Sequence, residues 1–181
     1  MIRENAYHSS IYNTLTVPVF APANYISTNK GRDDYSKHIV FGKKADHFEY
    51  FLPFAEPVID ELFSTHKVDL VVVVPRSPIG RVLSPTMSHF ANWISDKFAV
   101  THRDVISRIK AGTKQADIHD IESRFAAVQG VFQLDALEAS EKNILLLDDV
   151  KTSGATVLEC AHILRNAGAN EVTAFCLGIN G

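Results

Sequence analysis

The chain has 181 residues, of which 46% are hydrophobic, and a formal net charge of −3. This length and composition fit one α/β domain with a modest appendage and a single hydrophobic core. A weakly acidic chain lacks the general positive surface that nucleic acids require, which leaves only a local basic patch at Lys37, Lys43 and Lys44 for such a partner.

The sequence carries no signal for a membrane or an oxidising compartment. No apolar run approaches the length of a membrane-spanning helix, and residues 1–5 lack the apolar core of a signal peptide. We therefore expect a cytoplasmic protein without a membrane partner. Cys160 and Cys176 both lie in apolar segments, so we expect buried free thiols rather than a disulfide or a zinc site.

The first 45 residues show little regular patterning and are expected to form a small N-terminal hood over a core at residues 46–181. A strand is predicted at residues 14–20. Pro18 lies inside it, and because proline cannot donate to a sheet ladder, this strand is expected at an edge or with a bulge.

The core alternates strand patterns with helix patterns. Helices are predicted at residues 47–63, 84–98 and 155–167, and strands at 69–74, 105–109, 128–134, 144–147 and 171–177. Pro53 and Pro57 predict a late start or a kink in the first of these helices. Alternation of this kind predicts a parallel, Rossmann-like α/β sheet with helices on both faces and ligands at the carboxyl ends of its strands.

The most informative segment begins with the strand at 144–147. Asp148 and Asp149 follow it, and the small residues 152–156 then lead into a helix. Backbone N–H groups in a tight loop at a helix N-terminus bind phosphate, and Gly154 lets that backbone come close to a ligand. Carboxylates are poor phosphate ligands but accept hydrogen bonds from vicinal ribose hydroxyls. The segment therefore predicts a cradle for a phosphorylated sugar.

This segment closely resembles the phosphoribosyl-pyrophosphate (PRPP) motif of the type I phosphoribosyltransferases. The resemblance implies that Asp148 and Asp149 bind the ribose 2′- and 3′-hydroxyls and that the loop binds the 5′-phosphate. The loop positions that match are Lys151, Thr152, Ser153, Gly154, Ala155 and Thr156. The alternative interpretation is a buried strand that ends in an Asp-rich turn and caps the helix.

A second candidate segment, Pro75, Arg76 and Ser77, follows the predicted strand at 69–74. It should lie at the same edge of the sheet. In type I phosphoribosyltransferases a loop at this place binds pyrophosphate, and Arg76 has the bidentate geometry for that ligand. The alternative is a surface arginine in a turn bounded by prolines.

Three further segments resemble the ComF-like branch of the family: residues 35–44, 108–115 and 124–132. Three departures from that branch stand out. The N-terminal zinc-binding cysteines are absent, residues 81–87 differ from the stretch expected after the pyrophosphate loop, and Ala127 replaces an asparagine. These departures affect the expected acceptor side more than the PRPP side.

The polar segment 109–122 is expected to be the flexible loop that closes over the reacting centre and excludes water. The candidate residues of this loop and its approach are Arg108, Lys110, Thr113, Lys114 and Gln115. Lys110 and Lys114 would neutralise the leaving pyrophosphate, with Lys114 as a catalytic residue. A solvated charged loop without a role is the alternative for each single residue.

The resemblance implies transfer of the 5-phosphoribosyl group from PRPP to an unidentified nitrogen acceptor, with release of pyrophosphate. Mg²⁺ is the implied cofactor, held largely by PRPP with Asp148 and Asp149 nearby. Asp149 is also a candidate general base.

The sequence does not identify the nitrogen acceptor. The aromatic residues that could stack on a flat base are Tyr25, Phe41, Phe48 and Tyr50, although such residues are more often part of a core. Two other functions stay open: a non-catalytic PRPP- or nucleotide-sensing module that acts through a partner protein, and a pyrophosphatase-like activity. A homodimer is also left open.

Overall fold

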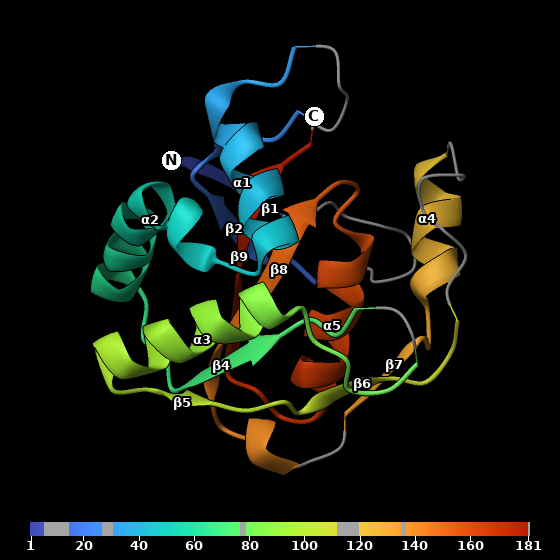
Figure 1. Cartoon of the computed structure of the whole chain (residues 1–181). Helices are drawn as coiled ribbons and strands as arrows, with labels where there is room; N and C mark the ends of the chain where they lie inside the picture. The colour runs from blue at the N-terminus through green and yellow to red at the C-terminus, as the bar shows by residue number, and fades with distance from the viewer. Residues whose placement is uncertain (6–14, 27–30, 77–78, 112–119, 135–136, 181) are drawn as a thin grey trace.

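The protein is built around one twisted, mostly parallel sheet (Figure 1). The structure, a computed structural model, describes residues 1–5, 15–26, 31–76, 79–111, 120–134 and 137–180. Within these residues the sheet has seven strands, and only the β1–β2 pairing is antiparallel. The predicted α/β fold with a parallel sheet is confirmed.

Six strands follow one another across the sheet. In spatial order they are β1 (Ile2–Asn5), β2 (Pro18–Ala21), β9 (Glu171–Ile179), β8 (Asn143–Lys151), β4 (Leu70–Val73) and β5 (Thr101–His102). The short β3 (Ala23–Asn24) pairs with the end of β9. Outside this sheet, β6 (Ile106–Arg108) and β7 (Phe132–Leu134) form a separate antiparallel pair.

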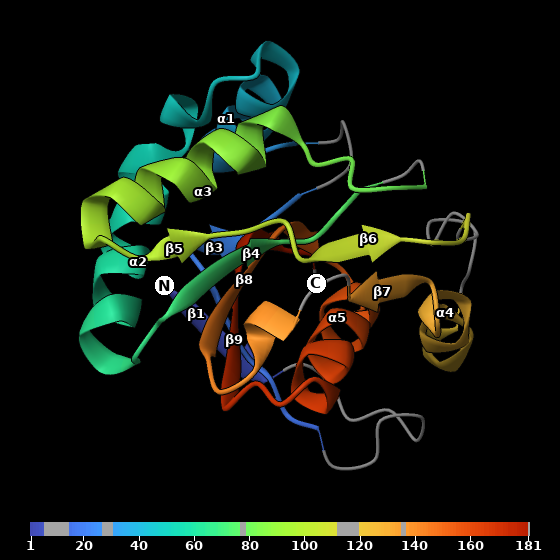
Figure 2. The ribbon, with the colours of Figure 1, turned by 90° about the horizontal axis from the view of Figure 1, so that it is seen from below.

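Helices cover both faces of the sheet (Figure 2). The helices α1 (Asp34–Ala45), α2 (Leu52–Thr65) and α3 (Pro85–Phe98) lie on one side, and α5 (Ala155–Asn166) lies on the other, with α4 (Ile121–Val128) beside it. Two 3₁₀ turns, Phe48–Tyr50 and Leu137–Ala139, complete the regular structure described. No helix in the described part of the chain has the length and apolar character needed to cross a bilayer.

The central strands are buried on both faces, which explains their continuous apolar sequence. Along β4, Leu70 and Val72 face the core under α5, whereas Val71 and Val73 face the core under α2 and α3. Burial of each such side chain contributes about 1.5–3 kcal/mol relative to exposure. The alternation also fixes the register, because a slip of one residue would exchange the two faces.

Several sequence-based expectations needed correction. Residues 1–45 are not irregular, because they contain α1, which starts after an Asp33 side chain that accepts a hydrogen bond from the Ser36 N–H. Pro18 is not at an edge, since β2 lies between β1 and β9. Pro18 instead opens the strand, where its missing N–H costs least.

Other elements differ from the prediction at their boundaries. Val128 ends α4 rather than starting a strand. The helix α2 begins late, as the prolines predicted, with Pro53 in its first turn, and it continues through Pro57. The strand β8 runs on to Lys151 because β9 stays paired with it that far, although β4 stops pairing at Leu147.

Candidate functional site

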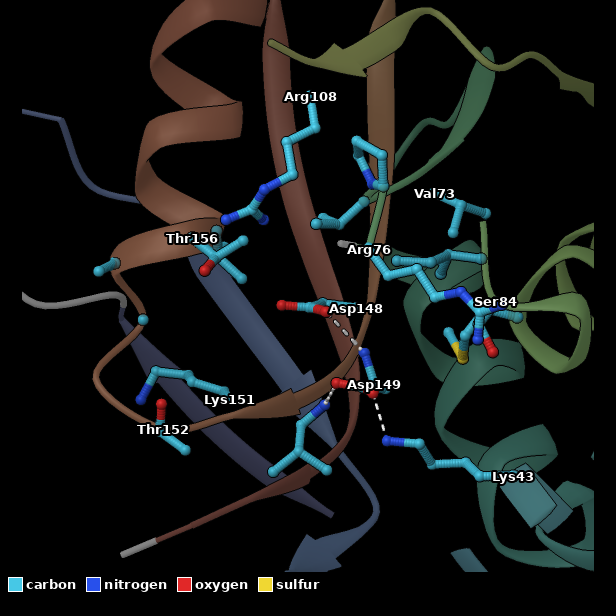
Figure 3. A pocket seen from close by; sticks show the side chains of 18 residues that line it. Lys43, Val73, Arg76, Ser84, Arg108, Asp148, Asp149, Lys151, Thr152 and Thr156 are labelled. Atoms are coloured by element: carbon cyan, nitrogen blue, oxygen red, sulfur yellow. Dashed lines mark hydrogen bonds and ion pairs between the residues drawn. The ribbon is translucent and has the colours of Figure 1, made fainter. Parts of the chain in front are cut away.

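A cavity of about 360 Å³ lies at the carboxyl end of the sheet, where parallel α/β proteins bind their ligands. Its walls come from the ends of β4 and β8, the start of α5, and side chains of α1, α3 and β6. The lining residues with polar side chains are Lys43, Arg76, Ser84, Arg108, Asp148, Asp149, Lys151, Thr152 and Thr156 (Figure 3). Segments more than 100 residues apart therefore meet at one site.

Asp148 and Asp149 lie on the part of β8 that extends beyond β4. The Asp148 Oδ1 accepts a hydrogen bond from the Asp149 N–H at 2.8 Å, and the Asp149 Oδ1 accepts one from the Val150 N–H at 2.6 Å. Burial, together with the adjacent Asp149 charge, raises the pKa of the Asp148 carboxyl to about 7. The pair therefore holds a carboxyl group that can exchange a proton near neutral pH.

The loop after β8 leads into α5, as the sequence predicted, whereas its role as a phosphate cradle stays a prediction. Gly154 has a positive φ of 80° at the N-terminal cap of α5, a conformation that favours glycine. The buried Ser153 lies outside the cavity lining, and its Oγ accepts a hydrogen bond from the Ala155 N–H at 3.3 Å. Thr152, Gly154, Ala155 and Thr156 line the cavity. The N–H groups at a helix N-terminus point out of the helix, and together with the helix dipole they make this end attractive to an anion.

Lys151 is the unexpected member of the loop, because its side chain is only 2% exposed although it contributes to the cavity lining. The Asn180 N–H donates to its carbonyl oxygen at 2.7 Å, which ties the end of β8 to the end of β9. Lys151 is thus a largely buried residue whose backbone is fixed beside the loop at residues 152–154.

Pro75 and Arg76 also line the cavity, as expected for the segment after β4, whereas Ser77 lies outside the described residues. The Val74 N–H donates to the Leu147 carbonyl at 2.9 Å, which places Pro75 beside the acidic pair. The Arg76 N–H donates to the Val82 carbonyl at 2.9 Å and closes a loop. This bond fixes the backbone of Arg76 beside the cavity, while its side chain is exposed.

Arg108 reaches the cavity from β6 (Figure 3). Two backbone hydrogen bonds join it to Gly80, N–H to carbonyl in both directions, at 2.7 and 2.9 Å. Its guanidinium carbon lies 5.2 Å from the centre of the Phe132 ring, a cation–π distance. The loop after β4 is therefore hydrogen-bonded to β6, and each of them contributes an arginine to the cavity lining.

The remaining candidates of the flexible loop separate into two groups. Lys110 is exposed and does not line the cavity, and its carbonyl accepts a hydrogen bond from the Arg108 Nε at 3.2 Å. Thr113, Lys114 and Gln115 lie outside the described residues, so the roles predicted for them stay predictions.

Lys43 is the main residue that the site prediction lacked. It lies on α1, and its ammonium forms an ion pair with the Asp149 Oδ2. The sequence indicated it only as part of a basic segment before the core. Lys37, its predicted neighbour in a basic patch, instead pairs with Asp34 at 2.8 Å. Ser84 and Met87 of the α3 region also line the cavity and were not predicted.

None of the aromatic residues considered for stacking on an acceptor lines this cavity. Phe48 packs near Phe90 and Trp93, Tyr25 packs against the core under α1 to α3, and Phe41 and Tyr50 are exposed. Cys160 and Cys176 are buried and free, as predicted, and burial raises the pKa of both thiols so that they stay protonated.

The fold and the site define a class: a mostly parallel α/β protein with an acidic pair and a glycine-containing loop before a helix N-terminus, both at the carboxyl edge of its sheet. No model of a known protein family matches the sequence. Over 134 residues the chain is 32% identical to transcriptional regulator GfcR 1 of Methanosarcina barkeri, a match that covers 71% of this chain and 54% of that protein. The chain thus spans about half the length of this curated relative.

Three solved structures are similar over most of the chain. The glutamine PRPP amidotransferase of B. subtilis is 18% identical with a TM-score of 0.44, and the match covers 79% of this chain and 26% of that one. An allosteric regulatory enzyme of purine biosynthesis has 17% identity, a TM-score of 0.43 and the same coverage. The purine phosphoribosyltransferase of Pyrococcus horikoshii is 14% identical with a TM-score of 0.47, and 87% of this chain and 79% of that chain are covered.

Proposed function

We propose that the cavity binds PRPP and that the protein is a phosphoribosyltransferase, which transfers the 5-phosphoribosyl group to a nitrogen acceptor. One observation carries this proposal: the acidic pair, Thr152, residues 154–156 and Arg76 all line a single cavity. PRPP needs this combination, because the molecule has a sugar diol between two phosphate-bearing ends.

Each part of the cavity has a role in this proposal. The loop at residues 152–156 and the start of α5 would bind the 5′-phosphate. Asp148 and Asp149 would accept hydrogen bonds from the ribose hydroxyls, and Arg76 would bind the diphosphate. Positioning and charge stabilisation then account for most of the catalysis, because bond cleavage at C1 leaves a cationic sugar and an anionic diphosphate.

The acidic pair also provides candidates for proton transfer. Asp149 is the proposed general base toward the entering nitrogen. Asp148 has a pKa of about 7, a value that suits exchange of a proton at neutral pH.

Mg²⁺ fits this site as an ion brought by the ligand. Asp148 and Asp149 offer the oxygen donors that Mg²⁺ prefers, but the ammonium of Lys43 already lies on Asp149 and opposes a second cation there. Within the described residues no three acidic, histidine or cysteine side chains form a group that could hold a metal. When bound, Mg²⁺ would neutralise diphosphate oxygens, with the acidic pair nearby.

A second candidate function is ligand sensing without turnover. Two observations favour it: the relative in Methanosarcina barkeri is named a transcriptional regulator, and none of the four candidate aromatic side chains lines the cavity to stack on an acceptor base. In this alternative, PRPP or a nucleotide binds to the same residues and the signal passes to a partner protein.

Calorimetric titration of PRPP with Mg²⁺, with pyrophosphate release followed in the same sample, tests both functions. Release that requires an added nucleobase or ammonia supports the transferase, whereas binding without release supports the sensor. Release without any acceptor would indicate a pyrophosphatase-like activity. No binding of PRPP would overturn the proposal in all its forms.

A variant with Asp148→Asn and Asp149→Asn ties the result to the acidic pair. We expect it to fold and to lose PRPP binding. Asp96→Asn, on the exposed surface of α3, removes a charge of the same sign away from the cavity and should bind like the wild type. Tight PRPP binding by the folded double variant would contradict the role of the pair.

A further inference from the structure

Lys43 is held at the cavity by a helix that is fixed at both ends. At the start of α1, the Tyr35 hydroxyl donates to the carbonyl of Leu177 in β9, and the Ser36 Oγ accepts a hydrogen bond from the Ile26 N–H at 2.9 Å. These contacts bind the helix to the sheet and to the preceding segment.

The other end of α1 is fixed close to Lys43 itself. The Thr86 Oγ1 donates to the Asp46 carboxylate at 3.0 Å, which joins the end of α1 to the start of α3. At Gly42 an added Cβ would lie 2.9 Å from the His47 carbonyl oxygen and 3.2 Å from the Phe51 ring. Lys43 is therefore presented to the cavity by a helix end that packs closely against its neighbours.

The position of Lys43 indicates which part of a ligand it would meet. In Figure 3, Thr152 of the phosphate-type loop lies on one side of the acidic pair, and Lys43 and Arg76 lie on the other. A ligand that places its 5′-phosphate in the loop and its diol on the carboxylates must extend its other end toward Lys43 and Arg76. Two cations thus face the end of the cavity away from the loop.

The bonding of Lys43 leaves capacity for an anionic ligand. Its ammonium has three donors, and one of them is used by the Asp149 Oδ2. Its side chain is 36% exposed, so it is open to the cavity. An ammonium can hold a carboxylate and a phosphate oxygen at the same time, and the carboxylate then fixes where the cation lies.

We propose that Lys43 and Arg76 form a two-cation clamp for the diphosphate group of the ligand, with Asp149 holding Lys43 in place. This inference rests on the proposed function and adds a residue of α1 to the site. It makes Lys43 a selectivity residue: the protein should distinguish PRPP from ribose 5-phosphate, which lacks the diphosphate, largely through these two side chains.

The test compares Lys43→Met with Lys44→Met in calorimetric titrations with PRPP, ribose 5-phosphate and inorganic pyrophosphate, each with Mg²⁺. Met keeps much of the apolar stem and removes the charge. Lys44 is the next residue of α1, is exposed and does not line the cavity, so its variant removes an equal charge from the same helix. Circular dichroism and thermal unfolding confirm that both variants fold.

We expect Lys43→Met to weaken PRPP and pyrophosphate binding by about 10-fold or more, as for loss of a charge-assisted contact. The affinity of Lys43→Met for ribose 5-phosphate should change less than about 2-fold. Lys44→Met should leave the affinities for all three ligands unchanged. Tighter PRPP binding by Lys43→Met would show that the ion pair blocks the site, and equal weakening of PRPP and ribose 5-phosphate would show that Lys43 acts only on Asp149. Either result overturns the clamp while the proposed function stands. A wild type that binds none of the three ligands overturns both.

Discussion

The two halves of the site are assembled in different ways. The half proposed to bind the sugar phosphate, residues 148–156, is one continuous segment, and hydrogen bonds between near neighbours at Asp148, Asp149 and Ser153 shape its backbone. The capping half consists of Lys43, Arg76 and Arg108, which come from α1, the loop after β4, and β6. Each capping residue reaches the cavity only because distant elements pack together. Local sequence can therefore specify the first half alone, whereas the second depends on the whole fold.

The largest effect is expected at Gly154, in the sugar-phosphate half. Gly154→Ala forces a φ near 80° on a residue with a Cβ, at a cost of about 1–2 kcal/mol. The Cβ also enters the loop that would approach the phosphate, so PRPP affinity should fall by about 100-fold, or about 2.7 kcal/mol. Calorimetry and urea unfolding measure the two effects.

Gly31→Ala is the matched control, because Gly31 has a φ of 79° and no described residue has an atom within 4 Å of the Cβ position. It should lose similar stability and keep its PRPP affinity. An equal loss of affinity in both variants would mean that backbone strain, not the loop, determines binding.

The next largest effect is expected in α1, the helix that carries Lys43 of the capping half. Gly42→Ala should destabilise the protein by about 1–3 kcal/mol, because the Cβ meets the His47 carbonyl in a closely packed position. This loss should exceed the gain of up to about 1 kcal/mol that alanine gives a helix. Lys44→Ala, on the exposed side of the same helix, should stay within about 0.5 kcal/mol. A more stable Gly42→Ala protein would show that α1 is free to shift, and the two halves would then differ less than the packing indicates.

A third effect concerns pH and the acidic pair. The native pKa of Asp148, about 7, lies above its ordinary 3.8, so the native state binds this proton more tightly than the unfolded state. The contribution of Asp148 to stability is therefore greatest below pH 4 and is lost as the pH rises toward 7. Asp148→Asn removes this ionisation and should stabilise the protein by about 1–3 kcal/mol at pH 8.

Urea unfolding at pH 4, 6 and 8 measures this effect, and the advantage of Asp148→Asn should disappear near pH 4. Asp96→Asn, at an exposed position of α3, serves again as the control. If the free energies of unfolding of Asp148→Asn and the wild type differ by the same amount at all three pH values, the assignment of the raised pKa to Asp148 is contradicted.

The smallest effect is expected from the ring under Arg108. Phe132→Leu keeps an apolar side chain and removes the cation–π contact, which is worth about 0.5–1 kcal/mol. PRPP affinity should fall by about 2- to 5-fold if this contact orients Arg108 toward the ligand. Phe125→Leu, at a buried ring on α4, controls for the loss of a phenyl group. Equal changes in both variants would indicate a packing effect alone.

The amino-acid sequence was enough to predict the parallel α/β fold, the helix after the 152–154 loop, and the placement of Asp148, Asp149 and this loop together at one edge of the sheet. These features depend on apolar periodicity and on bonds between near neighbours, and both can be recognised along the chain. Segment 75–76 was also predicted, because the carboxyl ends of parallel strands meet at one edge.

The remaining features of the site depend on long-range packing that no local pattern shows. The helix α1 was predicted as irregular, because it is charged and contains Gly42, and its place depends on contacts with β9 and α3. The pairing of Lys43 with Asp149 joins residues 106 positions apart, and no local pattern encodes such a contact. The raised pKa of Asp148 results first from burial, which depends on the fold, and second from the charge of the adjacent Asp149. Long-range packing thus determines the charge and the capping of a site whose backbone the local sequence already specifies.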